Sequence, residues 1–387
     1  MPGFEVVGSE ERDQVLDVFQ NGGVLFRHGF EDRRRGSFKV REFESKFSEF
    51  LGSPFCLAVS SGTAALRVAL AALRIEPGDE VITQAFTFVA TVEAIIESGA
   101  QPVIAEIDET MNLDPASLAS LIGPRTKAVI AVHMLGTPAN LKAIEEVTNR
   151  SGVALLEDVA WGCGGRLAGK PLGTWGRMGC FSFDHAKAIT TGEGGMIAFR
   201  DESDFRTAAA WHDHGHENNP GLARWEDSRS SSGFNFRMSE LQGAVGIAQL
   251  SKLPRIVESQ RSSRDAIVEA VSDLHGVVVR PKPESSFETA DGLVFLLPDP
   301  AAALATRVEL LANGIGTKIL PEATTWHFAA HWDHMPELVS RHGPLGEAFP
   351  VSRGLLERAV SIPVLIGQSE EVPGLVRKSL ETVLGLS

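Results

Sequence analysis

The sequence predicts an α/β protein whose mostly parallel β-sheet is covered by helices on both faces, followed by a smaller C-terminal domain. Short apolar segments alternate with longer helical ones up to about Arg200, which is typical of parallel sheets. The chain has 387 residues, 43% hydrophobic and 22% charged, and at about 150 residues per domain this size allows two or three globular domains. After Arg200 the alternation fades.

The alternation begins with a strand at residues 56–60 that runs directly into an Ala- and Leu-rich helix at residues 63–75. A Pro-Gly-Asp turn at residues 77–79 separates this helix from the next strand. Further strands are predicted at residues 80–83, 102–107, 128–133, 153–157 and 196–199, and further helices at residues 91–98 and 139–150. Ligands bind at the carboxyl ends of parallel strands, so residues that follow these strands are the candidates for chemistry.

The second half of the chain is organised differently. Residues 212–232 are polar, with three consecutive serines, which predicts a long exposed loop. A long helix is expected from residue 238 to about residue 274, and residues 277–283 are interpreted as a linker. We therefore expect a large ligand-binding domain at residues 1–255, which includes an N-terminal segment lining the substrate site, and a small domain at residues 256–387.

Charge and composition argue against several functional classes. The chain has 36 basic and 50 acidic residues, a net charge of −14, which does not favour nucleic acid or an anionic membrane as its partner. No apolar run reaches the roughly 18–20 residues of a membrane-spanning helix, and a signal peptide is not recognisable. Three widely spaced cysteines and two histidine groups, at residues 212–216 and 327–334, match no known ligand pattern. We expect a cytoplasmic protein without a metal.

The strand end at residues 60–65 is the first candidate site. Gly62 lets the backbone approach a ligand, and the helix that begins beside Thr63 and Ala64 offers unpaired N–H groups and a positive dipole to an anion. This segment is therefore a candidate phosphate cradle. Taken alone, it is more simply explained as a plain helix cap with Thr63 as the capping residue, because such caps are common.

Asp158 and Lys187 are the other two candidates. Asp158 ends a predicted strand, and Lys187 lies in a loop between an aromatic strand and a glycine-rich turn. Burial lowers the pKa of a lysine, which then becomes nucleophilic and can form a Schiff base with a carbonyl. A loop acid or a surface lysine explains each residue alone. Their co-occurrence with the cradle indicates pyridoxal 5′-phosphate (PLP), which requires an anion site, an acid for its pyridinium nitrogen and a lysine.

Several short motifs, in order along nearly the whole chain, resemble the DegT/DnrJ/StrS family of sugar aminotransferases. They are residues 61–66, 77–81, 87–91, 124–128, 157–158, 181–195, 233–238 and 249–250. The resemblance implies the fold type I architecture of PLP enzymes, with a seven-stranded, mostly parallel sheet in the large domain and a smaller C-terminal α/β domain.

The resemblance also implies roles for individual residues. Lys187 corresponds to the Schiff-base lysine, Asp158 to the acid on the pyridine nitrogen and Phe88 to the ring that stacks on the cofactor. The positions that correspond to phosphate ligands are Gly62, Thr63, Ala64 and Ser182, together with Asn235 from a second subunit, which implies a homodimer with shared active sites. Trp161 replaces a glutamine that usually contacts the ring hydroxyl, and an indole donates one hydrogen bond but accepts none.

Further short motifs are similar to the 8-amino-3,8-dideoxy-manno-octulosonate aminotransferases, which place an amine on an acidic sugar of lipopolysaccharide. They are residues 2–5, 25–27, 213–216, 235–237 and 326–327. This resemblance implies 8-oxo-3-deoxy-manno-octulosonate as the acceptor. The implied substrate contacts are Arg27, His185, His216, Arg237 and His327. An arginine suits bidentate recognition of a carboxylate, but ordinary salt bridges explain Arg27 and Arg237 equally well.

The expected activity is transamination, in which an amino donor, glutamate, passes its amine to a keto- or aldehydo-sugar. Asp158 keeps the cofactor ring protonated, and Lys187 moves a proton between substrate and cofactor carbons. Two alternatives remain at this point: a PLP-dependent sugar dehydratase, and a PLP-binding sensor without turnover.

Overall fold

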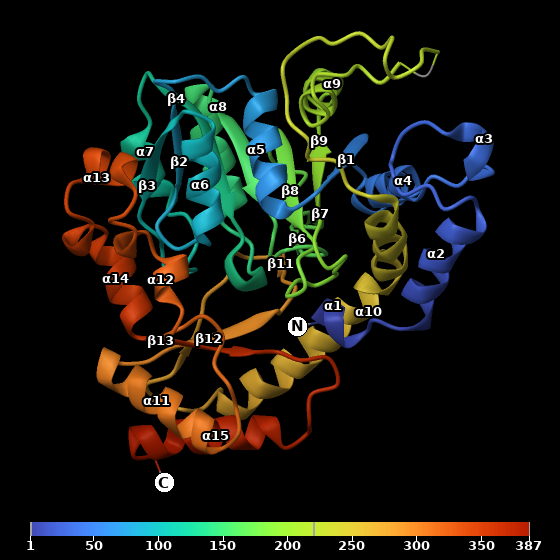
Figure 1. Ribbon diagram of the computed structural model, residues 1–387. Helices are drawn as coiled ribbons and strands as arrows, with labels where there is room; N and C mark the ends of the chain where they lie inside the picture. Colours follow the sequence, from blue (N-terminus) through green and yellow to red (C-terminus); the bar gives the residue numbers. More distant parts are fainter. Residues whose placement is uncertain (1, 220, 387) are drawn as a thin grey trace.

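The computed structural model describes residues 2–219 and 221–386, and a seven-stranded sheet forms its centre (Figure 1). The strand order is β1-β9-β8-β5-β4-β2-β3, and only β9 runs antiparallel to its neighbours. The strands are β1 (Phe55–Val59), β2 (Glu80–Gln84), β3 (Gln101–Ala105), β4 (Thr126–Val132), β5 (Ala154–Asp158), β8 (Met178–Ser182) and β9 (Gly195–Phe199). The predicted mostly parallel sheet is confirmed, and the strands predicted from apolar runs lie within a few residues of their expected positions.

Helices cover both faces of this sheet, as the strand sequences require. Successive residues of a strand face opposite sides: Leu57 and Val59 pack into one apolar layer, and Cys56 and Ala58 into the other. The first layer includes α5 (Gly62–Ala72) and α6 (Val89–Glu97), and the second α4 (Lys39–Leu51), α8 (Leu141–Ser151) and the first half of α10 (Glu240–Val271).

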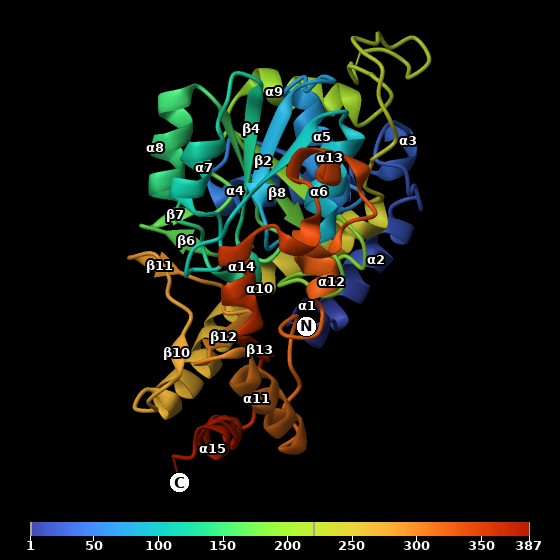
Figure 2. The same cartoon turned by 90° about the vertical axis from the view of Figure 1, so that its left-hand side faces the viewer.

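A smaller unit lies below the large sheet, as Figure 2 shows from the side. Its antiparallel sheet has the order β10-β12-β13, formed by β10 (Val278–Val279), β12 (Gly292–Leu296) and β13 (Ala359–Pro363). This sheet shares an apolar core with α11 (Pro300–Ala312) and α15 (Val372–Leu384). The stretch interpreted as a linker, residues 277–283, therefore contains an edge strand. Its first residues pair with β12, and two prolines end the pairing because they lack N–H groups.

The long helix expected at residues 238–274 is confirmed as α10, which runs from the large sheet toward the smaller unit (Figure 1). Ser239 caps its first turn through the backbone N–H of Gln242, and Pro254 lies inside it. The division that we expect between residues 255 and 256 falls within this helix and remains a proposal.

The other elements are short or lie at the edges. They are α1 (Pro2–Glu5), α2 (Ser9–Gln20), α3 (Glu31–Arg34), α7 (Pro115–Leu121), β6 (Arg166–Leu167), β7 (Lys170–Pro171), α9 (Glu202–Trp211), β11 (Ser286–Phe287), α12 (Thr324–His327), α13 (Pro336–His342) and α14 (Pro350–Glu357), with short 3-10 turns at Met134–Gly136, Ala329–His331 and Leu345–Glu347. None of the helices in the described part of the chain combines the length and the apolar character that crossing a bilayer requires.

Candidate active site

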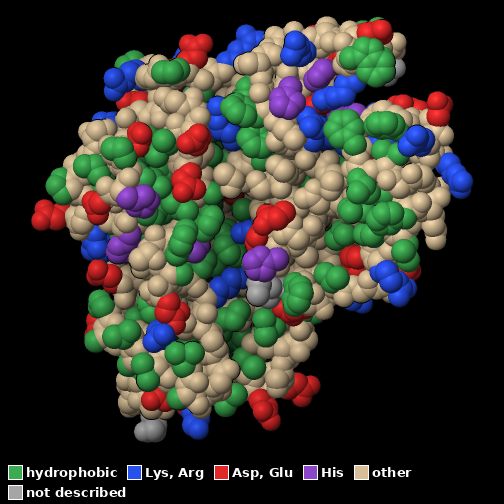
Figure 3. Space-filling view, in the orientation of Figure 1, with side chains coloured by type: hydrophobic (Ala, Val, Ile, Leu, Met, Phe, Trp, Pro, Cys, Tyr) green, Lys and Arg blue, Asp and Glu red, His purple; other side chains and the backbone are tan. Residues whose placement is uncertain are grey.

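A cavity of about 420 Å³ opens where β5 and β8 end and α5 begins. The same face of the molecule is hollowed between the large sheet and the smaller unit, with basic, acidic and histidine side chains beside the hollow (Figure 3). Nine of the predicted site residues line the cavity: Gly62, Thr63, Phe88, Asp158, Trp161, Ser182, His185, Lys187 and His327. Segments that are far apart in the sequence thus meet at the strand ends, as expected for this sheet type.

Asp158 is the last residue of β5 and is buried in the wall of this cavity. Its Oδ2 accepts a hydrogen bond from Thr91 Oγ1 at 3.0 Å, and its Oδ1 accepts one from the backbone N–H of Ala160 at 3.1 Å. Burial raises the pKa of Asp158, while the two donors and Lys187 act against this rise. Thr91 lies one helical turn after Phe88 in the motif at residues 87–91, and its side chain alone carries no signal in the sequence for this contact.

The preceding carboxylate, Glu157, points to the other face of the sheet. It accepts hydrogen bonds from the backbone N–H groups of Gly173, Trp175 and Gly176 at 2.7–2.9 Å, and His133 Nε2 lies 3.2 Å from it. His133 Nδ1 accepts a bond from the Ala139 N–H, so Nε2 carries the proton that faces Glu157. Of the two adjacent acids, only Asp158 is therefore available to a ligand in the cavity.

Lys187 lies in the loop between β8 and β9, with its side chain half-buried toward the cavity. Its Nζ is 3.6 Å from the centroid of the Trp161 ring, a cation–π contact. Burial lowers the pKa of Lys187 to about 8, although nearby carboxylates favour the charged form. The neutral amine, which a nucleophilic lysine requires, is therefore more available near neutral pH than in a lysine with an ordinary pKa.

The first turn of α5 faces the cavity from the other side. Its N-cap is Ser61, whose side chain accepts the Ala64 N–H at 3.0 Å, so the interpretation of Thr63 as the cap is wrong. In the described part of the chain, the N–H groups of Gly62 and Thr63 have no acceptor, as expected at this position in a helix. A Cβ on Gly62 would lie 2.6 Å from Ser182 Cβ, so only glycine allows this approach.

Aromatic rings form the entrance of the cavity. Phe88 is 41% exposed, and its ring centroid lies 5.3 Å from that of His327 and 6.5 Å from that of Trp326. His327 is buried, which lowers its pKa, and its Nδ1 is 2.8 Å from the Ala323 carbonyl. A flat ligand could therefore stack on Phe88.

The remaining predicted residues lie outside this cavity. Arg27 is buried and pairs with Glu44 at 2.8 Å, and His216 pairs with Asp227 at 3.1 Å. Arg237 pairs with Asp213. Asn235 is exposed on the long segment after α9, and the Ala64 N–H is occupied by the Ser61 cap. The structure of one chain thus gives Arg27, His216, Arg237 and Asn235 no place in the cavity, while His185 lies exposed at its rim.

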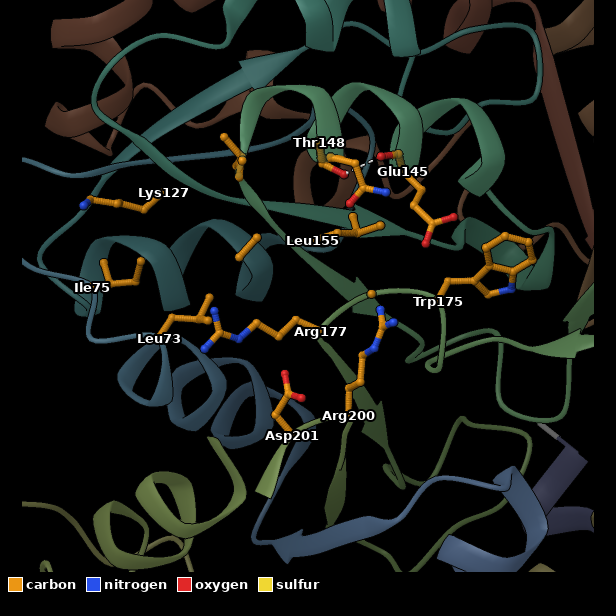
Figure 4. Close-up of a pocket in the computed structure, with 15 residues that line it drawn as sticks. Leu73, Ile75, Lys127, Glu145, Thr148, Leu155, Trp175, Arg177, Arg200 and Asp201 are labelled. Carbon is orange, nitrogen blue, oxygen red and sulfur yellow. Dashed lines mark hydrogen bonds between the residues drawn. The ribbon is translucent and has the colours of Figure 1, made fainter. Parts of the chain in front are cut away.

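A second cavity of the same volume lies at the opposite ends of the strands (Figure 4). Its lining is mixed in charge, and one of its basic residues, Arg177, is already paired with Asp204 through two nitrogens. The charged lining residues are Lys127, Arg177, Arg200, Glu145 and Asp201. It contains none of the predicted site residues. Volume alone therefore does not distinguish the two cavities, whereas the chemistry of the lining does.

The groups around the first cavity fit PLP. Free N–H groups at a helix start suit its phosphate, a buried carboxylate suits its ring nitrogen, and a lysine of lowered pKa suits its aldehyde. Because Gly62 and Ser182 are in close contact, both lie at the end of the cavity where α5 begins and where the phosphate would bind. The sequence motifs name these groups, and the structure adds that they surround one cavity.

Comparison with known proteins gives the same result. The model of the DegT/DnrJ/EryC1/StrS aminotransferase family matches residues 31–379. The chain is 31% identical to the spore coat polysaccharide biosynthesis protein SpsC of Bacillus subtilis, over 95% of this chain and 92% of that protein. It is 30% identical to a GDP-perosamine synthase of Vibrio cholerae, over 91% and 90%. An aminotransferase structure from Psychrobacter cryohalolentis superposes with a TM-score of 0.86 at 25% identity, covering 98% of both chains.

Proposed function

The chain belongs to the DegT/DnrJ/EryC1/StrS aminotransferase family, whose members use PLP, and from this premise we propose that it transfers an amino group from glutamate to a keto- or aldehydo-sugar. The single observation that carries the proposal is the meeting of Lys187, Asp158 and the start of α5 around one cavity. The names of the relatives support a sugar acceptor, since GDP-perosamine and spore coat polysaccharide are both carbohydrate products.

Each residue has a defined task in this reaction. When bound, PLP supplies a reactive aldehyde and a ring that withdraws electrons from the substrate carbon. Asp158, held by Thr91 and the Ala160 N–H, would keep a proton on the ring nitrogen. Lys187 is the residue that would hold the aldehyde, and once its amine is free it would move a proton at the substrate carbon as general base and acid.

The other lining residues hold and orient the cofactor. The N–H groups of Gly62 and Thr63 and the hydroxyl of Ser182 would donate to its phosphate, and Phe88 would stack on its ring. Trp161 stands where the family has an amide, so it could donate one hydrogen bond to the cofactor through its indole N–H but could accept none. His185 and His327 lie at the rim, where the acceptor sugar enters.

We extend the proposal to a homodimer with shared active sites. The segment after α9 projects from the body of the chain (Figure 1), and Trp225 and Phe234 on it are 87% and 59% exposed. Asn235 and Arg237 lie at the base of this segment, outside their own cavity. A partner copy would bury these rings and bring Asn235 to the phosphate of the neighbouring site, and Arg237 to its substrate.

The acceptor that we propose is 8-oxo-3-deoxy-manno-octulosonate, an acidic sugar whose aminated form is part of lipopolysaccharide. We place the reaction in the cytoplasm. The support is the set of short motifs at residues 2–5, 25–27, 213–216, 235–237 and 326–327. Within this proposal, Arg237 and His216 reach the acceptor from the partner copy. Arg27 acts indirectly: it pairs with Glu44 and donates to the Ala58 carbonyl in β1, which precedes the cradle.

The test is the visible absorbance of the purified protein before and after addition of glutamate, with Lys187→Ala in parallel. We expect a PLP band that glutamate converts to the amine form of the cofactor in the natural chain, and no turnover in the variant. Full activity of Lys187→Ala would refute the mechanism. A band that does not respond to glutamate would favour the dehydratase or the sensor, and release of amino product without loss of water excludes the dehydratase.

A further inference from the structure

We propose that Asp291 is a positioning residue for Lys187: its unpaired carboxylate oxygen receives the lysine ammonium whenever Lys187 is not bonded to the cofactor. Asp291 belongs to the smaller unit, whereas Lys187 and Asp158 belong to the large sheet. The inference rests on the proposed function of Lys187, and it adds a residue that the sequence analysis did not single out.

Asp291 lies directly before β12 and is 2% exposed. Lys318 Nζ binds its Oδ2 and also donates to its backbone carbonyl at 3.1 Å. Within residues 2–219 and 221–386, Asp291 Oδ1 has no hydrogen-bond partner. Because an unpaired buried carboxylate oxygen costs free energy, its presence indicates a donor that reaches it in another state of the cycle.

Trp161 places this pair beside Lys187. The ring centroid of Trp161 is 3.6 Å from Lys187 Nζ and 5.0 Å from Lys318 Nζ, so two ammonium groups share one indole. Thr289 Oγ1 donates to the Trp161 carbonyl at 3.0 Å and fastens the tryptophan to the segment that carries Asp291. Lys318, the ion-pair partner of Asp291, thus lies at the same indole as Lys187, and Asp291 is the carboxylate whose charge acts most strongly on Lys187.

The backbone on both sides of the ion pair is strained. Ala290, directly before Asp291, has φ +58°, and Ile319, directly after Lys318, has φ +69°. A β-branched residue is rarely found in the left-handed region, where it costs about 1–2 kcal/mol. Such strain is found mainly where a functional geometry must be maintained. Here it fixes the backbone beside Asp291 and Lys318, and the Lys318 ammonium lies over the Trp161 ring.

The charges around Lys187 come from both units. They are Asp158 at the end of β5, Asp184 in the lysine's own loop, His327 in α12, and Asp291 and Lys318 from the smaller unit. Burial lowers the pKa of Lys187; Asp291 raises it more than Asp158 or Asp184 does, and Lys318 lowers it. Asp291 and Lys318 therefore shift the pKa of Lys187 in opposite directions, although they form an ion pair with each other.

This arrangement gives Asp291 a defined task. After the donor amine displaces Lys187, the lysine must stay beside the substrate carbon to take up and return a proton. A carboxylate at the wall holds the ammonium form over Trp161 and prevents it from turning into the open cavity. Asp291 acts through Lys187 and does not itself contact the reacting atoms.

The first experiment measures Lys187 in the cofactor-free protein. We would follow its acetylation by acetic anhydride as a function of pH, by mass spectrometry, in the natural chain, Asp291→Asn and Lys318→Met. The midpoint should fall by about one pH unit in Asp291→Asn, because a nearby negative charge is lost. It should rise in Lys318→Met, because a repelling charge is lost. Equal midpoints, or shifts in the same direction, would overturn the proposal.

The second experiment uses the loaded protein. In a single turnover with glutamate, Asp291→Asn should be about tenfold slower, with an apparent Kd for PLP close to that of the natural chain. Asp273→Asn is the matched control: this exposed acid of the smaller unit pairs with Arg377 and should change neither value. If Asp291→Asn does not fold, Asp291→Glu keeps the charge and should show an unshifted acetylation midpoint.

The two proposals can fail separately. If Lys187→Ala retains turnover, the proposed function fails whatever Asp291 does. If Lys187 is essential and Asp291→Asn matches the natural chain in both experiments, only the positioning role fails.

Discussion

Gly62 is the glycine of the candidate phosphate cradle, and its neighbours leave no room there for a side chain. We expect Gly62→Ala to weaken PLP binding by about tenfold or more, because the new methyl would lie 2.6 Å from Ser182 Cβ and displace the start of α5. The measurement is a titration of the cofactor-free protein with PLP. The control is Gly374→Ala in α15, where no atom lies near the added carbon. Equal affinities for both variants would contradict this view of the cradle.

Thr91 is the residue that decides how Asp158 is held. Removing its hydroxyl in Thr91→Val deletes one of the two donors to a buried carboxylate, and burial already raises the pKa of Asp158. A lost bond to a charged group corresponds to about 1.5 kcal/mol or more, so the half-reaction with glutamate should slow about tenfold. Thr91→Ser retains the hydroxyl and should remain close to the natural rate. A Val variant as fast as the Ser variant would show that Asp158 does not depend on Thr91.

At the scale of elements, His342 joins α13 to the edge strand β3. Its Nε2 accepts the backbone N–H of Ile104 at 3.0 Å, and burial lowers the pKa of His342 to about 4. Between this value and the ordinary value near 6.5, the unfolded chain binds a proton that the folded chain does not. The stability that His342 contributes is therefore present above pH 6.5 and is lost as the pH falls toward 4.

We expect the free energy of unfolding to fall by about 1–2 kcal/mol more between pH 6.5 and 5 in the natural chain than in His342→Gln. Glutamine keeps a hydrogen-bond acceptor but does not titrate. Urea unfolding of the cofactor-free protein at several pH values measures the difference. Parallel pH profiles for the two proteins would mean that the α13–β3 contact does not depend on a neutral histidine.

At the scale of the whole molecule, the homodimer with shared active sites that we propose predicts complementation between two inactive chains. Lys187→Ala removes the lysine, and Asn235→Asp places a negative charge where we propose that the partner's phosphate lies. Mixing the two variants and allowing subunits to exchange should restore activity to about a quarter of the natural value, since a mixed dimer keeps one intact site. No recovery, with exchange shown by mass spectrometry, would mean that each chain builds its site alone.

The large sheet was easier to predict from the sequence than the smaller C-terminal unit. We could predict the sheet, its alternation with helices, and α10. The spacing of apolar residues and the length of each segment are local features that can be seen in the sequence. The smaller unit was predicted only as a domain, and β10 was interpreted as linker, because a two-residue strand at an edge carries almost no periodic signal.

The sequence by itself determined the alternation of strands and helices, the family, and the two residues that we propose carry the chemistry, Lys187 and Asp158. These follow from local patterns and from motif order, which do not require the fold to be known. Tertiary structure alone decided which of Glu157 and Asp158 faces the cavity and that Ser61 caps α5, because these depend on sheet pairing and exact helix start. It alone brought Thr91 and Asp291 to the site, since side chains that converge from distant segments leave no common pattern in the sequence.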